Sequence, residues 1–308
     1  MNPITLENIS KSYDKNVTLA VDDVSFSVDE GEIFGLIGPD GAGKTSIFRI
    51  LTTLLLPDKG KATVCDNDVV AGYKIIRGLV GYMPGRFSLY QDLTVEENLN
   101  FFAALFNTSI EANYNLIKDI YVQLEPFKKR RAGKLSGGMK QKLALCCALI
   151  HKPKVLFLDE PTTGVDAVSR FEFWDMLKRL KAQGITILVS TAYMDEVEHC
   201  NRVALMNLGK ILSINTPSQI VEDFPELLFA VKADNKHKVL KDLTAFNNVF
   251  NSYASGEYIH ISFTKNGNSS DHIIEELKQY LQEKGHTHIE VASAKPDIED
   301  CFLSLVKH

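Results

Sequence analysis

Apolar and alternating stretches divide the chain into strands and helices in an order typical of an α/β protein. Residues 4–9 and 21–28 alternate between apolar and polar positions, which predicts two strands of a small antiparallel β layer. Residues 33–37, 155–158 and 185–189 are almost continuously apolar, as is typical of strands that are covered on both faces of a parallel sheet. We therefore predict an α/β fold with a mixed or parallel core sheet and an antiparallel β subdomain.

A helical insertion interrupts this core. Residues 94–131 have apolar positions at helical spacing, with a loop near residues 107–109. Thr94 is followed three residues later by Glu97, a pair that forms a capping box at a helix start. The pattern predicts a helical subdomain over about residues 86–150.

The pattern changes beyond Pro217 to short alternating strands and amphipathic helices. We predict strands over residues 228–233, 258–263 and 288–293 and helices over residues 236–246, 271–284 and 298–306. Two domains follow, residues 1–220 and residues 221–308, with the boundary near residues 215–225. The second is a small α+β accessory domain without a recognisable chemical motif.

A glycine-rich loop follows the strand predicted over residues 33–37. It matches the phosphate-loop pattern G-x-x-x-x-G-K-S/T and precedes a helix predicted from Thr45 to about Leu54. Its residues are Gly38, Pro39, Asp40, Gly41, Ala42, Gly43, Lys44, Thr45 and Ser46. Backbone N–H groups and a helix N-terminus attract phosphates, Lys44 adds a positive charge, and the Thr45 hydroxyl is suited to Mg²⁺. The loop predicts a P-loop NTPase that binds an anion with several phosphates; the alternative is a chance glycine loop.

Two carboxylates end the strand predicted over residues 155–158. Ligands bind at the C-terminal ends of strands in parallel sheets, which is where Asp159 and Glu160 lie in the sequence. Asp159 is positioned to hold Mg²⁺, and Glu160 to take a proton from an attacking water. The alternative for an isolated pair of acids is a solvated loop.

Two further segments allow a binding role beside a structural one. Tyr13, in a loop before the phosphate loop, would either cover local apolar surface or stack on a nucleotide base. Ser136, Gly137 and Gly138 precede a Leu- and Ala-rich helix. They would either cap that helix or form a second anion-binding helix terminus.

Composition narrows the class of protein. The chain has 308 residues, 45% hydrophobic and 24% charged, as in an ordinary globular protein. Its net charge of −5 gives no reason to expect a nucleic-acid partner. The five cysteines have no metal-type or redox spacing, which favours reduced thiols in the cytosol. No signal peptide and no membrane span are predicted, so any role at a membrane would require a partner.

The order of these motifs resembles that of the ATP-binding subunit of an ABC transporter. The resemblance covers residues 1 to about 220 and rests on the phosphate loop, the Leu135–Gly138 turn, the strand that ends in Asp159 and Glu160, and the Gly164–Asp166 turn. The C-terminal segment 296–302 resembles the tail of subunits that drive drug exporters. This implies an ATPase that drives export through membrane-spanning permease subunits and lies on the cytoplasmic face of the cell membrane.

The resemblance also assigns roles to residues. It implies that Tyr13 stacks on adenine, that residues 38–46 enclose the phosphates of ATP, and that Asp159 supports Mg²⁺ while Glu160 polarises the water. It also implies that Ser136, Gly137 and Gly138 contact ATP bound to a second ATP-binding subunit. Asp166 would lie in the turn that communicates across the interface between the two subunits. Residues 86–92 would transmit motion to the membrane subunits.

The sequence departs from the family at two positions. Gly85 stands where the family has a glutamine that reaches Mg²⁺ and the water, and Ala192 stands where it has a histidine that contacts the γ-phosphate. Loss of one such donor costs roughly 10²–10³ in rate. Asp40 also replaces the usual asparagine, and a carboxylate near phosphates is unfavourable unless it points away.

A pairing hypothesis reconciles these losses with the intact Ser136–Gly138 turn. This subunit would pair with a different, complete ATP-binding subunit and lend its turn to the competent site. Two alternatives remain: an ATP-gated binding module with little hydrolysis, and a soluble ABC-type ATPase that acts on nucleic acid or ribosomes. The last would be expected to have a basic surface or two fused ATPase halves, and the sequence has neither.

Overall fold

A computed structural model describes residues 2–14, 18–265 and 269–307. The chain divides into two compact units, residues 1–217 and residues 218–308. Each unit has its own sheet and its own hydrophobic core.

Unit 1 begins with an antiparallel sheet in the order β2-β1-β4-β5. Its strands are β1 (Ile4–Ser12), β2 (Leu19–Val28), β4 (Lys59–Val64) and β5 (Asn67–Asp68). Every second residue of β1 near its start is buried, including Ile4 and Leu6, because one face of the sheet packs on the core. The predicted antiparallel β subdomain is confirmed.

A six-stranded mixed sheet forms the centre of unit 1, in the order β10-β9-β3-β8-β7-β6. Its strands are β3 (Ile33–Ile37), β6 (Val80–Met83), β7 (Val155–Asp159), β8 (Thr186–Thr191), β9 (Arg202–Asn207) and β10 (Lys210–Asn215). All neighbours are parallel except β9 and β10, which form a closing hairpin. All residues of β3, β7 and β8 are buried, which explains their continuous apolar sequences.

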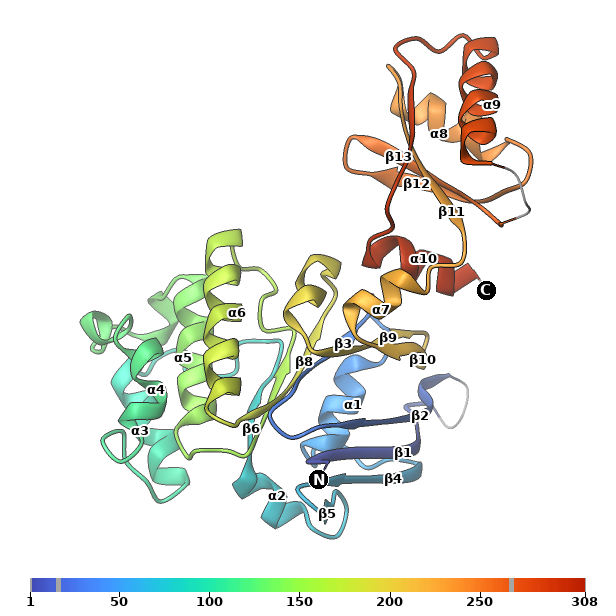
Figure 1. The fold of residues 1–308 in the computed structure, drawn as a ribbon. Coiled ribbons are helices and arrows are strands. Elements are labelled where there is room, and N and C mark those ends of the chain that lie inside the picture. Colours follow the sequence, from blue (N-terminus) through green and yellow to red (C-terminus); the bar gives the residue numbers. More distant parts are fainter. Residues whose placement is uncertain (1, 15–17, 266–268, 308) are drawn as a thin grey trace. The chain divides into compact units, whose positions relative to one another are not determined.

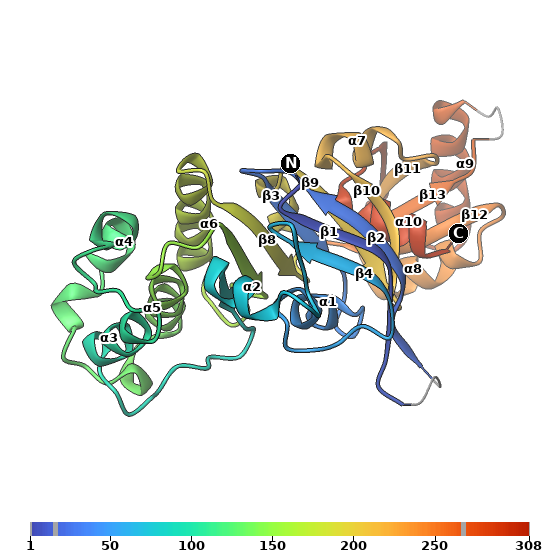
Figure 2. The ribbon, with the colours of Figure 1, turned by 90° about the horizontal axis from the view of Figure 1, so that it is seen from below.

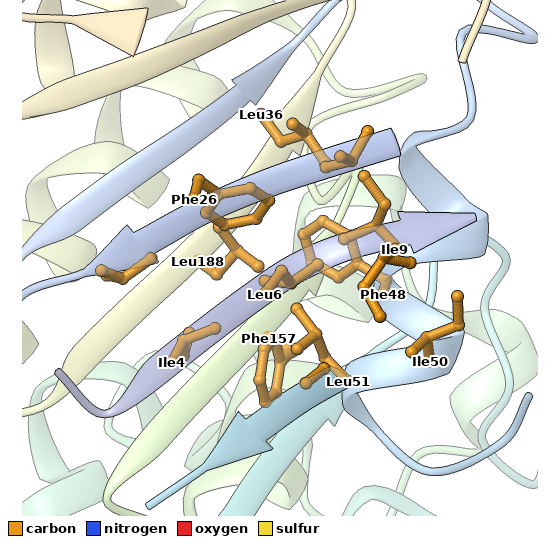
Figure 3. Close-up of a cluster of buried hydrophobic side chains, with 14 of the residues drawn as sticks. Ile4, Leu6, Ile9, Phe26, Leu36, Phe48, Ile50, Leu51, Phe157 and Leu188 are labelled. Atoms are coloured by element: carbon orange, nitrogen blue, oxygen red, sulfur yellow. The ribbon is translucent and has the colours of Figure 1, made fainter. Parts of the chain in front are cut away.

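Helix α1 (Lys44–Leu51) lies between the two sheets of unit 1 (Figures 1 and 2). Figure 3 shows the core that this arrangement creates. Ile4 and Leu6 come from the antiparallel sheet, Phe48 from α1, and Phe157 and Leu188 from the mixed sheet. The Phe48 and Phe157 rings meet edge to face with centroids 6.1 Å apart. This core fixes the start of α1 against the ends of the central strands.

The remaining helices of unit 1 include those of the predicted helical stretch. They are α2 (Tyr73–Leu79), α3 (Val95–Leu105), α4 (Tyr114–Tyr121), α5 (Gly137–Leu149) and α6 (Ala167–Ala182), with short 3₁₀ helices η1 (Glu125–Phe127), η2 (Ala132–Lys134) and η3 (Met194–His199). The capping box at Thr94 is present: Glu97 N donates to Thr94 Oγ1 at 3.2 Å, and Thr94 N donates to Glu97 Oε2 at 2.7 Å.

Unit 2 is an α+β unit with an antiparallel sheet in the order β12-β13-β11-β14. Its elements are α7 (Pro217–Glu222), β11 (Leu227–Lys232), α8 (Lys236–Thr244), β12 (Val249–Ser255), β13 (Tyr258–Phe263), α9 (Ser270–Glu283), β14 (Glu290–Ser293) and α10 (Ile298–Lys307). From β11 to β14 the sequence is βαββαβ, the split βαβ arrangement of ferredoxin-like folds. Phe229 and Ile261 lie in its core beneath Leu277 of α9.

Several predicted boundaries were wrong. Helix α6 begins at Ala167, where Asp166 caps it, and exposed residues such as Val168 in its first turn leave no apolar periodicity to mark this start. Helix α1 ends at Leu51, where Thr53 adopts a positive φ of 63°. Strand β12 and helices α2 and α7 were not predicted. No residue of β12 is fully buried, which removes the alternation that identifies a strand.

Candidate nucleotide-binding site

Four parallel strands end at one edge of the mixed sheet and bring the predicted site residues together. Ile37, the last residue of β3, is in register with Thr191 of β8, and Asp159 of β7 is in register with Ser190. Met83 of β6 is in register with Leu158. The segments that follow these strands therefore meet at the C-terminal edge of the sheet, where parallel sheets bind ligands.

The phosphate loop connects β3 to α1 with glycine where no other residue fits. Gly41 and Gly43 have φ angles of +80° and +103°. A Cβ atom on Gly43 would also lie 2.1 Å from the carbonyl oxygen of Ala20, and one on Gly38 would lie 2.1 Å from that of Met206. Asp40 is exposed. The backbone fold of this loop thus depends on the glycines of the phosphate-loop pattern.

Lys44 is the most buried charged group of the loop. Only 3% of its surface is exposed. Its Nζ donates to the carbonyl oxygens of Gly38 at 2.6 Å and Pro39 at 3.0 Å, and lies 3.2 Å from Glu160 Oε1. The ammonium group is therefore held at the inner side of the loop, in contact with a carboxylate that phosphate oxygens would have to replace.

Asp159 lies beside Thr45 and Ser190, also at 3% exposure. Ser190 Oγ donates to Asp159 Oδ1 at 2.8 Å. Burial raises the pKa of Asp159, an effect opposed by hydrogen bonds from Ser190 and Thr45 and by the charge of Lys44, and increased by the charge of Glu160. A buried carboxylate next to a threonine hydroxyl supplies oxygen ligands of the kind that Mg²⁺ takes.

The described residues contain no group of three or more His, Cys, Asp or Glu side chains that could hold a metal ion by itself. Mg²⁺ usually binds through one or two protein groups together with phosphate oxygens and water. Thr45 and Asp159 fit that donor set.

Glu160 follows the strand in a left-handed backbone conformation with φ of 50°. Its N–H donates to Ser190 Oγ at 2.9 Å, which anchors the residue. Such a conformation is uncommon for a residue with a side chain and costs free energy that the surrounding structure must offset. Strained backbone conformations of this kind are concentrated at functional sites, which makes Glu160 a candidate functional residue.

Gly85 lies directly against these carboxylates. A Cβ atom at Gly85 would be 3.0 Å from the carbonyl oxygen of Asp159 and 3.7 Å from the Cβ atom of Glu160. Ala192 follows Thr191, whose carbonyl oxygen accepts a bond from Gly38 N of the phosphate loop at 3.3 Å. Both positions therefore adjoin the site, and neither has a side chain able to donate a hydrogen bond.

Tyr13 is connected to the phosphate loop through its hydroxyl, which lies 3.1 Å from Ser46 Oγ. Its side chain is 55% exposed. The ring is thus available at the surface beside the start of α1.

The Ser136–Gly138 turn and Asp166 form a second group. Ser136 caps α5, where its hydroxyl accepts from Met139 N at 3.4 Å, and Asp166 caps α6, where Oδ1 accepts from Ser169 N at 3.0 Å. The bond from Ser169 lowers the pKa of Asp166. A Cβ atom on Gly138 would lie 2.8 Å from Ser169 Oγ, so the two helix starts are in contact.

Ser190 was missed by the sequence analysis. It is fully buried and binds both the side chain of Asp159 and the backbone of Glu160. A signal was present, because Ser190 is a polar residue at the end of an apolar strand, as Asp159 is. Its partner could not be identified before the strand register was known.

A groove of about 720 Å³ separates the β6 region from α3 and α5. Tyr82, Met83, Leu89, Phe102, Leu105 and Phe106 are among its lining residues. Two leucines that line the groove are largely exposed, Leu105 at 62% and Leu54 at 58%. The groove is therefore an apolar surface within unit 1 that adjoins Gly85 through Met83 and Pro84.

Together these features define unit 1 as a P-loop NTPase domain with a site for a nucleotide phosphate chain. Comparisons with known proteins identify the family. The family model for ABC transporters matches residues 21–163. The Nod factor export ATP-binding protein I of Burkholderia pseudomallei is 39% identical over 223 residues, which cover 71% of this chain and 73% of that protein. The chain belongs to the family of ABC transporter ATP-binding proteins, which confirms the resemblance found in the sequence.

Two further comparisons extend this result. A probable multidrug ABC transporter ATP-binding protein, YbhF of Escherichia coli, is 37% identical over 307 residues, 98% of this chain. The chain spans about half of that relative, 52% of its length. A solved ATP-binding subunit of an ABC transporter matches 72% of this chain and 92% of its own with a TM-score of 0.65 and 27% identity. The predicted P-loop NTPase fold is confirmed.

A helix that spans a bilayer needs about 20 predominantly apolar residues. None of the helices in the described part of the chain meets this requirement.

Proposed function

We propose that this chain is the ATP-binding subunit of an export-type ABC transporter and couples ATP binding and hydrolysis to transport through separate membrane-spanning permease subunits. The observation that carries the proposal is the meeting of Lys44, Thr45, Asp159 and Glu160 at one sheet edge. The export direction is taken from the relatives, which are named for Nod factor export and multidrug transport.

Each residue of the site has a role that its chemistry allows. The backbone of residues 38–46 and the ammonium group of Lys44 bind the phosphates, and Tyr13 offers its exposed ring to adenine. Thr45 and Asp159 hold Mg²⁺, which when bound neutralises charge on the phosphates. Glu160 orients the attacking water and accepts its proton.

Hydrolysis at this site is slow in our proposal. Gly85 and Ala192 adjoin the site without a donor side chain, and each missing donor costs roughly 10²–10³ in rate. Asp40 is exposed, so solvent screens the repulsion between its carboxylate and the phosphates.

A second, complete ATP-binding subunit fits this arrangement. Ser136, Gly137 and Gly138 stand at the start of α5, where backbone N–H groups favour an anion. They would contact ATP held by that partner, with Asp166 in the adjoining turn between the subunits. The pair would contain one competent site and one that mainly holds nucleotide.

The apolar groove fits the permease subunits. Its exposed rim, with Leu54 and Leu105, is the kind of surface that a partner covers, and the region of residues 86–92 forms part of its border. Docking there would hold the subunit peripherally on the cytoplasmic face of the membrane. Movement of this region would carry changes at Gly85 to the membrane subunits.

The test is ATP turnover by the purified chain beside Glu160→Gln, with ATP binding measured in parallel. Binding without turnover above the variant is expected. Turnover of about 1–100 per second would overturn the slow-site proposal and favour a homodimeric motor. Absence of ATP binding would overturn the function itself.

A second candidate is an ATP-gated module in which ATP closes an interface and hydrolysis is dispensable. Gly85 and Ala192 favour it, whereas the anchored and strained Glu160 counts against it. Transport that persists when Glu160→Gln is combined with the equivalent change in the second ATP-binding subunit, so that neither site hydrolyses ATP, would favour this candidate.

A further inference from the structure

Glu196 is a buried carboxylate that joins three segments of the proposed site. It lies in η3, after β8, and only 3% of its surface is exposed. Thr191 Oγ1 donates to Glu196 Oε2 at 2.7 Å, and Thr162 Oγ1 donates to the same oxygen at 3.0 Å. Both threonines are buried, so these bonds form where water does not compete.

The first threonine connects Glu196 to the phosphate loop. Thr191 Oγ1 accepts a bond from Tyr193 N at 3.0 Å, which fixes the backbone on both sides of Ala192. The carbonyl oxygen of Thr191 accepts from Gly38 N. Ala192 has no side chain that can donate a hydrogen bond. This segment therefore contributes to the site only through the position of its backbone.

The second threonine, Thr162, connects Glu196 to the segment that follows β7 and its carboxylates. Thr162 lies two residues after Glu160, and its carbonyl oxygen accepts from Val165 N at 3.2 Å in the turn that leads to Asp166. Glu196 Oε2 therefore accepts hydrogen bonds from two segments of the site. One is the segment around Ala192, and the other is the turn between Glu160 and Asp166.

The other oxygen of Glu196 faces Arg170 on α6. Glu196 Oε1 has no hydrogen-bond partner in the described structure, and Arg170 Nη1 lies 3.7 Å from it. Arg170 N donates to Asp166 O, so this guanidinium belongs to the first turn after Asp166. Its other neighbours are the carboxylate of Asp195 at 3.5 Å and the ring of Tyr193 at 4.8 Å. A buried oxygen without a hydrogen bond favours a closer approach of Arg170.

We propose that Glu196 is a positioning residue that transmits movement of the Asp166 turn to the backbone at Ala192 and to Glu160. A closer approach of Arg170 to Oε1 would strengthen this connection. The shared Oε2 holds Thr191, at the end of β8, and Thr162, in the turn after β7, together. The inference rests on the proposed function, because it presupposes ATP at the phosphate loop.

The test is hydrogen–deuterium exchange of the full chain with and without Mg-ATP, with ATP affinity and thermal midpoint measured in parallel. In the wild type, ATP is expected to slow exchange in both segments, residues 160–166 and 190–196. Glu196→Gln keeps an oxygen for the two threonines but removes the charge opposite Arg170. It is expected to bind ATP within about twofold of wild type while residues 160–166 lose their protection.

Two matched variants sharpen the test. Glu198→Gln makes the same chemical change on an exposed side chain of the same turn and should behave as wild type. Arg170→Gln removes the guanidinium and leaves both threonine bonds, and should reproduce the effect of Glu196→Gln. In any preparation that turns over ATP, the rate should fall by up to about 100-fold at nearly constant affinity, as expected for misplaced groups.

Three outcomes would overturn the inference. Wild-type protection in Glu196→Gln would show that the link is absent. A general increase in exchange across unit 1 without ATP, together with a lower thermal midpoint, would show a purely structural role. Failure of the wild type to bind ATP would remove the proposed function, whereas normal wild-type binding with the first or second outcome would remove this inference alone.

Discussion

The ammonium nitrogen of Lys44 lies 3.2 Å from Oε1 of Glu160. The same nitrogen donates hydrogen bonds to two carbonyl oxygens of the phosphate loop, those of Gly38 and Pro39. The residue proposed to bind phosphate is thus paired with the residue proposed to accept a proton. In the proposed complex, phosphate oxygens of ATP would replace this carboxylate at Lys44, and Glu160 would be released toward the water.

Glu160→Gln should therefore bind ATP more tightly than the wild type. The variant removes an anion that competes for Lys44, and a partly exposed ion pair contributes about 0.2–1 kcal/mol. The expected gain in affinity is up to about fivefold in equilibrium titration. Glu7→Gln, an exposed position on β1, is the matched control and should not change affinity. Equal or weaker ATP binding by Glu160→Gln would show that the pair does not oppose ATP.

Asp159→Asn should stabilise the nucleotide-free protein at neutral pH. Burial raises the pKa of Asp159, so between its ordinary and its folded pKa the folded chain binds more protons than the unfolded chain. The free energy of unfolding then falls as pH rises through that window, and the ionised carboxylate costs stability above it. Asparagine removes this cost and can still accept from Ser190.

The measurement is the thermal midpoint as a function of pH. At pH 7 the thermal midpoint of the variant should be higher than that of the wild type, by about 2–4 °C for each kcal/mol gained in the free energy of unfolding. The difference between the two midpoints should shrink in acid. The variant should also lose the part of ATP stabilisation that depends on Mg²⁺. Asp119→Asn, at an exposed position, is the control. A lower midpoint for Asp159→Asn at pH 7 would contradict the argument.

The combined variant Gly85→Gln and Ala192→His should raise ATP turnover. Neither residue has a positive φ, and the Cβ atom at position 85 requires only a small shift of Asp159 O at 3.0 Å. Each restored donor is worth up to roughly 10²–10³ in rate. Addition of Glu160→Gln should abolish the gain. Unchanged turnover in the combined variant would mean that these two positions do not limit hydrolysis.

The parts of the fold and of the site that the sequence predicts are those with local causes. Thr94 and Glu97 are three residues apart, and the phosphate loop is one continuous segment, so spacing alone identifies them. Asp159 is identifiable because it ends an apolar run.

The parts that were missed depend on the register of strands. Ser190 meets Asp159 only because β8 pairs with β7, and Thr162 meets Glu196 across 34 residues of sequence. Strand β12 gives no signal because both of its faces are half-buried. These relationships come from tertiary packing, which local patterns do not encode.

Leu105→Glu should prevent assembly with the permease subunits and leave ATP binding intact. Leu105 is exposed on the rim of the apolar groove and lies outside the site. A charge there would be costly to bury against an apolar partner surface. Co-purification with the membrane subunits should be lost, whereas Val122→Glu, exposed beside α4, should assemble normally. Assembly of Leu105→Glu at wild-type yield would exclude the groove as the docking surface.

The two units should unfold in separate transitions if residues 221–308 form a domain of their own. Phe157 and Phe229 are matched probes, because each side chain is at most 1% exposed and lies in the core of its own unit. Replacement by alanine should cost about 3–5 kcal/mol in either case. In calorimetry, Phe157→Ala should lower one transition and Phe229→Ala the other. A single transition lowered by both variants would mean that the units fold as one cooperative body, and the accessory-domain interpretation would fail.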